Sequence, residues 1–265
     1  MKKKMFHLII VFFVAGLYGS TAFAFDPLGP PTAGFTGVGQ TSVALEYSWS
    51  KMDLDMDGIP NLDLLSDTIE NFEFNKIYTN LGLGSSDGSE LFLRLGVADA
   101  DPDKSDNSDN VAGYLGKSDQ SFLLGGGVKF TLYKREIVKW GLLAQMSWAN
   151  YDFDDRSYSI AGHNVALSTD IEIFEVQFAV GPAVNVRDNI AIYGGPFLHF
   201  LNGKAEQNGT IDGTSSEIDT DLKQDAILGA YVGIKLDITS HSDFNVEFQT
   251  TDAGYAVGGK MRYRF

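Results

Sequence analysis

Residues 253–265, which read AGYAVGGKMRYRF, alternate with a period of two. Successive side chains of a β-strand point to opposite faces, so this pattern predicts a strand with two different faces. One face is apolar and ends in aromatic residues: Tyr255, Val257, Gly259, Met261, Tyr263 and Phe265. The other face carries three cations in a row after two small residues: Ala256, Gly258, Lys260, Arg262 and Arg264. A core strand of a soluble β-sandwich rarely combines two such faces.

The same alternation of apolar and polar side chains recurs along the chain. It is clear in residues 43–50, 90–98, 121–130, 139–148, 174–185 and 244–249, and weaker in residues 74–84, 190–202 and 224–238. Each of these segments has the length and pattern of a two-faced strand. Together they predict about ten strands, with a range of eight to twelve.

The connections between these segments alternate in length. Short ones are residues 85–89, 134–136, 187–189 and 240–243, and long ones are residues 52–71, 101–118, 152–168 and 204–221. An even number of antiparallel strands, with short turns at one rim and long loops at the other, is typical of bacterial outer-membrane barrels. The sequence therefore predicts an all-β fold in which residues 41–265 form a closed antiparallel transmembrane β-barrel with short periplasmic turns and long extracellular loops.

The N-terminus has the features of an export signal. Lys2, Lys3 and Lys4 precede an apolar run over residues 5–17, and Ala22 and Ala24 supply the small residues of a cleavage site. We expect residues 1–24 to be a Sec signal peptide that is removed after Ala24. Residues 25–40 are rich in Pro and Gly, which predicts a non-strand segment below or inside the barrel.

Composition excludes several classes of protein. The 265 residues carry a formal net charge of −15 and contain no cysteine. Nucleic-acid binding needs a basic face, so no nucleic-acid partner is expected. The absence of cysteine excludes disulfides, thiolate metal sites and a cysteine nucleophile.

The signal peptide, the alternating strands and the terminal Tyr263-Arg264-Phe265 together resemble the small Gram-negative outer-membrane barrels of the OmpA-like and opacity-protein type. In that family a C-terminal Phe, preceded by aromatic or apolar residues at alternate positions, is the signal read by the barrel-assembly machinery. Phe265, Tyr263, Met261 and Val257 match that pattern here. The resemblance implies a location in the bacterial outer membrane, in contact with its lipid and lipopolysaccharide. It implies little about activity, because such barrels have diverse functions.

If the apolar faces meet lipid, the charged residues on the opposite faces point into the lumen. These are Glu46, Lys76, Arg94, Lys129, Lys139, Glu175, Lys235, Glu247, Lys260, Arg262 and Arg264. Eight of these eleven are cations, so we expect a basic lumen. A ten-stranded barrel is narrow, which favours paired charges that close the interior over an open pore. An open lumen of this charge would prefer anions.

The long loops are acidic, and one of them contains a candidate metal site. Asp53, Asp55, Asp57 and Asn61 occupy positions 1, 3, 5 and 9 of a sequence that resembles thrombospondin type-3 and EF-hand calcium loops, with Gly58 at position 6. Leu64 stands where the closing acidic ligand belongs, and Asp63 or Asp67 is the nearest substitute. The motif predicts at most weak Ca²⁺ binding, and the alternative is an Asp-rich surface turn.

Catalysis has little support in the sequence. Outside the signal, the histidines are His163, His199 and His241, and none lies in a nucleophile or zinc motif. We therefore expect a non-enzymatic protein and interpret His199 as part of a lumenal hydrogen-bond network.

The favoured function is that of a structural or surface-interaction barrel whose acidic loops meet an unidentified extracellular ligand and bind divalent cations. The alternatives are a small anion-preferring channel and a soluble exported β-protein.

Overall fold

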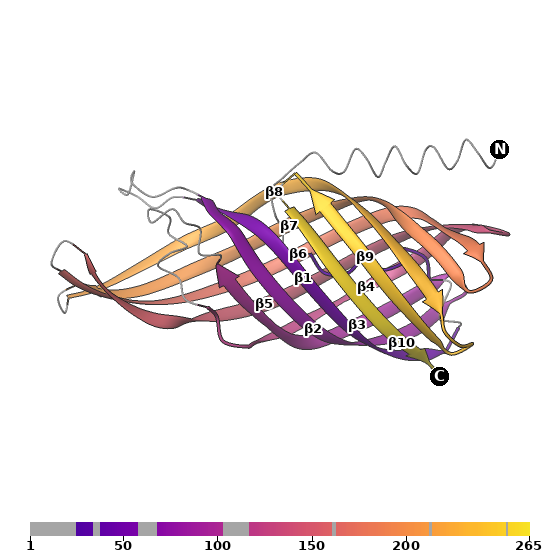
Figure 1. The fold of residues 1–265 in the computed structure, drawn as a ribbon, viewed down its shortest axis with the longest axis horizontal. Coiled ribbons are helices and arrows are strands. Elements are labelled where there is room, and N and C mark those ends of the chain that lie inside the picture. The colour runs from indigo at the N-terminus through magenta and orange to yellow at the C-terminus, as the bar shows by residue number, and fades with distance from the viewer. Residues whose placement is uncertain are drawn as a thin grey trace.

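A computed structural model describes residues 25–33, 38–57, 68–102, 117–160, 163–211, 214–252 and 254–265 (Figure 1). The regular elements of these residues are ten strands. Their bounds are β1 Thr41–Asp57, β2 Thr68–Ser86, β3 Ser89–Pro102, β4 Ser121–Arg135, β5 Val138–Ile160, β6 His163–Arg187, β7 Ile190–Ile211, β8 Thr214–Asp237, β9 Ser242–Thr251 and β10 Gly254–Arg264. No helix in the described part of the chain is long and apolar enough to cross a membrane.

The ten strands form a closed antiparallel barrel in which each strand pairs with its neighbour in sequence. β10 closes the barrel by pairing with β1 from Ser42↔Arg264 to Met52↔Gly254. The predicted all-β barrel of about ten strands is therefore confirmed. Beyond the short β9–β10 hairpin, β1 pairs directly with β8 through Met56↔Leu222 and Asp57↔Asp221, so fewer strands surround the lumen at that level.

The two faces of the wall differ as the alternation requires. Outward side chains are apolar and exposed, for example Leu45, Phe122 and Met261, while inward neighbours such as Glu46 and Arg262 are buried. A wall of this kind satisfies its backbone polar groups internally and leaves no edge in hydrocarbon, which is why a chain of strands can cross a lipid bilayer.

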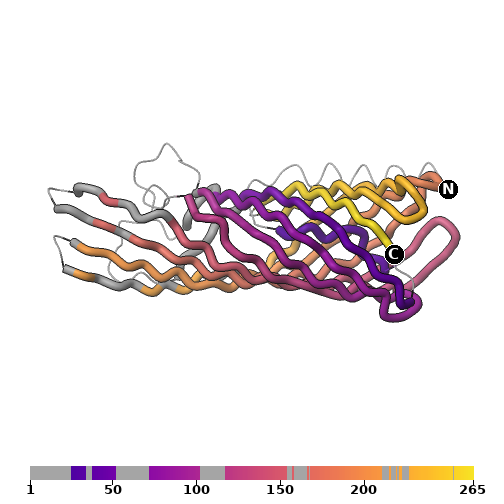
Figure 2. Tube along the Cα trace, turned by 90° about the horizontal axis from the view of Figure 1, so that it is seen from below, coloured from indigo at the N-terminus to yellow at the C-terminus, as the bar shows by residue number. Residues whose placement is uncertain are grey.

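β5, β6, β7 and β8 extend past the other strands at the end opposite the C-terminus (Figure 2). β5 and β6 stay paired as far as Ile160↔His163, and β7 and β8 as far as Ile211↔Thr214. Most of residues 152–168 and 204–221, expected to be loops, are therefore strand. Most of the exposed side chains that the structure describes in these two ranges are polar, as at Asp152, Glu206 and Asp219, so the apolar alternation that marks a lipid-facing strand is missing there.

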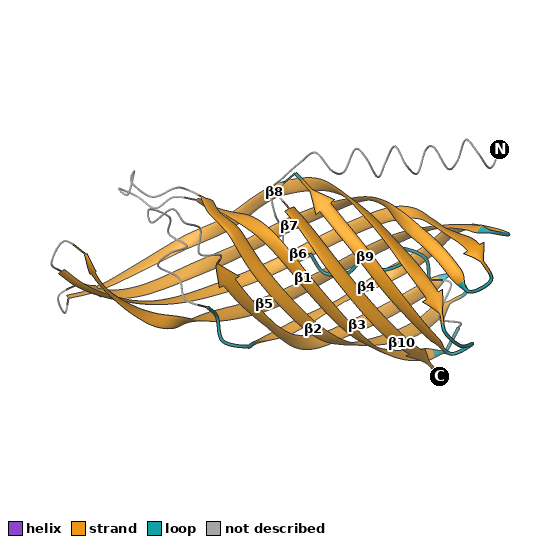
Figure 3. Ribbon diagram, in the orientation of Figure 1, coloured by secondary structure: helices purple, strands orange, loops and turns teal. Residues whose placement is uncertain are grey.

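The N-terminal segment, residues 25–33, runs inside the barrel (Figure 3). All nine residues are buried, although none of them belongs to the strand ladder. Near the periplasmic turns, the Ala33 amide donates to Thr131 Oγ1 of β4, and Gly39 and Gln40 pair with Gly84 of β2. At the other end of the segment, Phe25 packs against Phe197 of β7. The segment therefore extends from the periplasmic end into the middle of the lumen.

Candidate functional site: the lumen and its N-terminal segment

Asp26 occupies the centre of the polar part of the lumen. Its Oδ1 lies 3.1 Å from Lys76 Nζ, and its Oδ2 lies 3.8 Å from Arg94 Nη1. The Tyr78 hydroxyl also donates to Asp26. All four side chains are buried. A buried charge is costly unless it is paired, so these contacts fix where the carboxylate can lie.

The same two cations connect Asp26 to the barrel wall. Lys76 Nζ lies 2.6 Å from Glu175 Oε1, and Arg94 Nε lies 2.8 Å from Glu46 Oε2. Glu46 also pairs with Lys260 at 2.6 Å. The result is one continuous layer of alternating charges that spans β1, β2, β3, β6 and β10.

The wall also contacts the main chain of the N-terminal segment. The amides of Leu28 and Gly29 each donate to Glu247 at 2.8 Å. Lys129 Nζ donates to the carbonyls of Leu28 and Pro30 at 2.8 and 2.9 Å. Further donors reach the carbonyls of residues 25–27: Ser48 to Phe25, Gln249 and Gln145 to Asp26, and Arg94 to Pro27. Buried main-chain groups need such partners when they lie outside a sheet.

An apolar layer lies beyond the polar one, toward the extracellular end. It comprises inward side chains of β2, β5, β6, β7 and β8: Phe72, Phe74, Tyr151, Phe153, Ile171, Ile173, Leu201 and Leu222. Phe72 and Phe74 contact Phe153 and Tyr151 respectively across the lumen, with ring centroids 5.9 and 5.3 Å apart. Phe25 lies at the boundary between the layers, with its ring 5.3 Å from Phe197 and 5.0 Å from His199.

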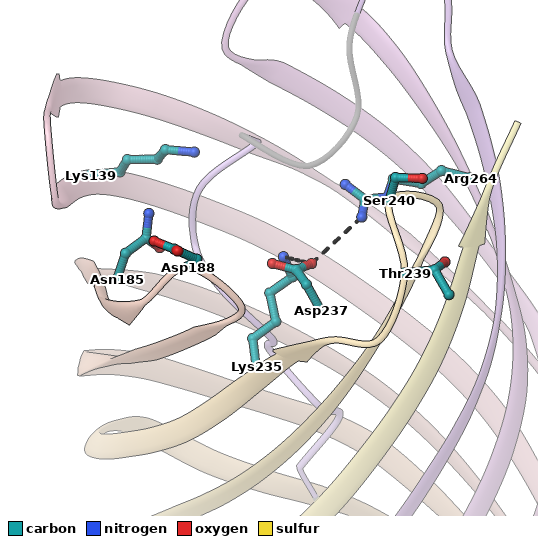
Figure 4. A pocket seen from close by; sticks show the side chains of 8 residues that line it. All are labelled: Lys139, Asn185, Asp188, Lys235, Asp237, Thr239, Ser240 and Arg264. Carbon is teal, nitrogen blue, oxygen red and sulfur yellow. Dashed lines mark hydrogen bonds and ion pairs between the residues drawn. The ribbon is translucent and has the colours of Figure 1, made fainter.

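The periplasmic end holds further ion pairs around an open pocket of about 380 Å³ (Figure 4). Arg262 donates from Nε and Nη2 to Asp243 Oδ2, both at 3.0 Å, and lies 3.5 Å from Glu90. In the pocket itself, Asp237 pairs with Lys235 and with Arg264. The pocket is lined by Lys139, Asn185, Asp188, Lys235, Asp237, Thr239, Ser240 and Arg264.

The structure brings most of the charged residues selected from the sequence to the inner face. Arg94, Lys129, Glu175, Glu247, Lys260 and Arg262 are buried there, and Lys139 and Arg264 lie at the periplasmic pocket. The excess of cations among the described lumenal residues is smaller than expected, however. Asp26, Glu90 and Asp243 are also buried in the lumen. They nearly balance the cations, so the lumen is not strongly basic.

Each of these three acidic residues was missing from the predicted set of lumenal charges for a different reason. Glu90 alternates in register with Arg94, so the strand pattern could have found it. Asp243 stands at a predicted turn, and β9 in fact begins at Ser242. Asp26 lies in a segment without periodicity, so nothing local indicates that it enters the barrel.

The predicted calcium motif lies only partly within the described residues. Asp53, Asp55 and Asp57 belong to β1, and β1 changes register with β2 between Met52 and Leu54. Asn61 and Asp63 fall outside the described residues. Among the residues that the structure does describe, no group of three or more His, Cys, Asp or Glu could hold a metal ion.

The other histidines and the terminal aromatics have separate surroundings. His163 begins β6, and His241 lies in a periplasmic turn, where it stacks on Tyr263. His199 is buried, with Nε2 3.5 Å from Glu175 Oε2. Tyr263 and Phe265 are exposed on the outer face with ring centroids 5.1 Å apart, and the Phe265 amide donates to Thr41 of β1 at 2.9 Å.

Comparison with solved structures finds outer-membrane proteins at low identity. Ail, the attachment invasion locus protein of Yersinia pestis, is 13% identical over 86% of this chain and 99% of that chain, with a TM-score of 0.33. The outer membrane protease OmpT of Escherichia coli is 7% identical over 85% and 97%, with a TM-score of 0.47. The toluene transporter TodX of Pseudomonas putida is 10% identical over 91% and 72%, with a TM-score of 0.42. The functions of these proteins do not transfer at such scores.

No curated protein matches the sequence. The family model for the outer membrane protein beta-barrel domain matches residues 71–265, which are most of the chain and include nine of the ten strands wholly or in large part. The chain therefore belongs to the outer membrane protein beta-barrel family and resides in the bacterial outer membrane.

Proposed function

We propose that this protein is a non-enzymatic outer-membrane barrel with a closed lumen, which acts through its extracellular end as a structural or surface-interaction protein. The observation that carries the proposal is the burial of residues 25–33 between the walls, at the level where Asp26 pairs with Lys76 and Arg94. A small barrel needs little additional material to close, because inward side chains already fill much of its interior.

In this proposal, the projecting ends of β5 to β8 form the surface that interacts with extracellular partners. Their exposed side chains are mainly acidic or amide: Asp152, Glu172, Asn202, Glu206, Asn208, Asp219 and Asp221, with Lys204 as a cation among them. A surface of this charge favours cationic partners. The extracellular ligand that we propose is accordingly a cationic surface or divalent ions that bridge to lipopolysaccharide phosphates.

Calcium binding by Asp53, Asp55, Asp57, Asn61 and Asp63 is part of the same proposal. Its support is the spacing of oxygen ligands in the sequence. Millimolar Ca²⁺ should raise the thermal unfolding midpoint of the wild-type protein, and the increase should shrink in Asp55→Asn, because a ligand that binds the folded state stabilises it. Equal shifts in both proteins would exclude this motif as the site.

A small anion-preferring channel is the second candidate. The pocket at the periplasmic end contains Lys139, Lys235 and Arg264, which would attract anions to a lumen if one were open. The balanced charges deeper in the lumen and the buried N-terminal segment make this function less favoured.

Planar-bilayer recording of the purified, membrane-inserted protein separates the two functions. The closed-barrel proposal predicts no stable single-channel steps, with insertion verified independently by protease protection of the strands. Steady, anion-selective conductance steps that become smaller in the Lys139→Gln variant would establish the channel function instead. Interaction with lipopolysaccharide can then be measured on the same preparation by flotation with vesicles that contain it.

A further inference from the structure

We propose that the inner wall of the barrel is a peptide-binding site, and that residues 25–33 are its tethered ligand, able to leave without unfolding the barrel. The ligand class is a proline-containing peptide without regular secondary structure, in which an aromatic residue precedes an aspartate. The inference deepens the proposed closed lumen, on which it rests, by making the segment that closes it a bound ligand that can be released.

The barrel does not need the segment for its own pairing. All ten strands form a closed ladder among themselves, and the segment contributes no strand to it. The two cations that bind Asp26 also have wall partners, since Lys76 pairs with Glu175 and Arg94 with Glu46. Loss of the segment would therefore leave both cations paired, which limits the cost of release.

The wall recognises the segment mainly through its main chain. Wall side chains reach consecutive carbonyls from Phe25 to Leu28, the Pro30 carbonyl, and the amides of Leu28 and Gly29. Recognition through main-chain groups is a common mode of peptide binding. Asp26 and the Phe25 ring add contacts specific to those two side chains.

Glycines in the wall provide the second, independent observation. A Cβ added to Gly258 of β10 would lie 2.8 Å from Pro27 Cγ, and one added to Gly141 of β5 would collide with the main chain of Pro31. Such distances are shorter than real contacts allow, so each glycine leaves room for the segment. In the segment itself, Gly29 has a φ of +65°, a conformation that other residues rarely adopt. The shapes of wall and segment are thus complementary at Gly258 and Gly141.

A matched pair of variants tests the site in the full chain. Gly258→Leu would press on Pro27, whereas a Cβ at the neighbouring Gly259 meets only the Asn245 carbonyl oxygen, at 3.9 Å. Hydrogen–deuterium exchange of the amides of residues 28 and 29 should be slow in wild type and Gly259→Leu. It should be at least about tenfold faster in Gly258→Leu, because exchange reports local opening. Equal exchange in the two variants would overturn the proposal.

A second measurement adds the ligand in trans. A variant that lacks residues 25–33 is folded in detergent, and a fluorescently labelled peptide of residues 25–33 is titrated into it. We expect saturable binding, weakened by at least about tenfold when the peptide carries Asp26→Asn, because hydrogen bonds to a charged group are lost. A folded barrel that does not bind, or that binds both peptides equally, would overturn the proposal. If this variant does not fold, the proposal that the segment is releasable fails.

These results are separable from the proposed function. Fast hydrogen–deuterium exchange at residues 28 and 29, in a wild-type barrel that shows no conductance, would refute the peptide site alone. Slow exchange together with steady conductance would refute the closed lumen while the peptide site stands.

Discussion

Lys76 connects the N-terminal segment to the barrel wall through a buried ion pair. It is buried between Asp26 and Glu175, at 3.1 and 2.6 Å. Removing one partner of a buried pair leaves uncompensated charge, so Lys76→Met should lower the free energy of unfolding by about 3–5 kcal/mol. Urea unfolding of the detergent-solubilised protein, followed by tryptophan fluorescence, measures this change.

Lys51→Met is the matched control for that prediction. Lys51 pairs with Glu73 at 3.0 Å on the outside of the same sheet, and the two side chains are 19% and 32% exposed. Partly exposed pairs contribute about 0–1 kcal/mol, so this variant should unfold almost as the wild type does. A Lys76→Met effect no larger than that of Lys51→Met would mean that the buried layer does not stabilise the fold.

The sequence predicts which residues of the barrel wall face the lumen, but it does not predict which residues of the N-terminal segment lie there. Arg94, Glu175 and Lys260 each alternate with apolar neighbours, and lipid on one face forces that alternation. Asp26 follows no period, and its partners lie 50 or more positions away in sequence. Only the closed barrel brings them together, so no local pattern could have identified Asp26.

The elements that differ most from expectation are β5 to β8. Lipid requires apolar outward residues only across its own thickness, and these strands continue past it with polar side chains on the outward face, such as Asp152 and Asn208. The apolar alternation in the sequence is therefore limited to the part of each strand that faces lipid, whereas the strands themselves continue beyond it. The pairing that continues, from Arg156↔Leu167 outward and from Gln207↔Ile218 outward, makes two long hairpins.

Shortening these two hairpins should leave the barrel itself intact. Replacing residues 157–166 and 208–217 with short Asn-Gly turns removes only ladder that lies beyond the barrel wall. The shortened protein should insert into vesicles and keep the heat-dependent shift in gel mobility that closed barrels show, while flotation with lipopolysaccharide weakens. Loss of the gel shift would show that the projecting strands are needed to close the barrel.

The aromatic residues at the C-terminal end of the chain are predicted to direct assembly of the barrel into the outer membrane. Tyr263 of β10 and Phe265, the residue after this strand, are exposed on the outer face, and the family resemblance predicts that they form the signal for the barrel-assembly machinery. Phe265→Ala should lower the amount of protein in the outer membrane of cells severalfold, while refolding into detergent stays unchanged. If refolding into detergent decreased together with the amount of protein in the outer membrane, the Phe265 ring would have a purely structural role.

At the scale of the whole molecule, the closed barrel follows from sequence, because the strand period is local. The contents of the lumen do not. Residues 25–33 approach β2, β3, β4, β5 and β9 at once, through Lys76, Arg94, Lys129, Gln145 and Glu247. That arrangement depends on the diameter and register of the finished barrel, which no single stretch of sequence encodes.

The central claim, that the N-terminal segment fills the lumen, is tested most directly by cysteine crosslinking. The native chain has no cysteine, and the Ala33 amide lies 3.1 Å from Thr131 Oγ1 on the inner face. Ala33→Cys with Thr131→Cys should oxidise to a disulfide in intact membranes, which blocks thiol labelling after denaturation. Ala33→Cys with Phe130→Cys, whose second site faces lipid, should leave both thiols free. Free thiols in the first pair, or a disulfide in the second, would contradict the account.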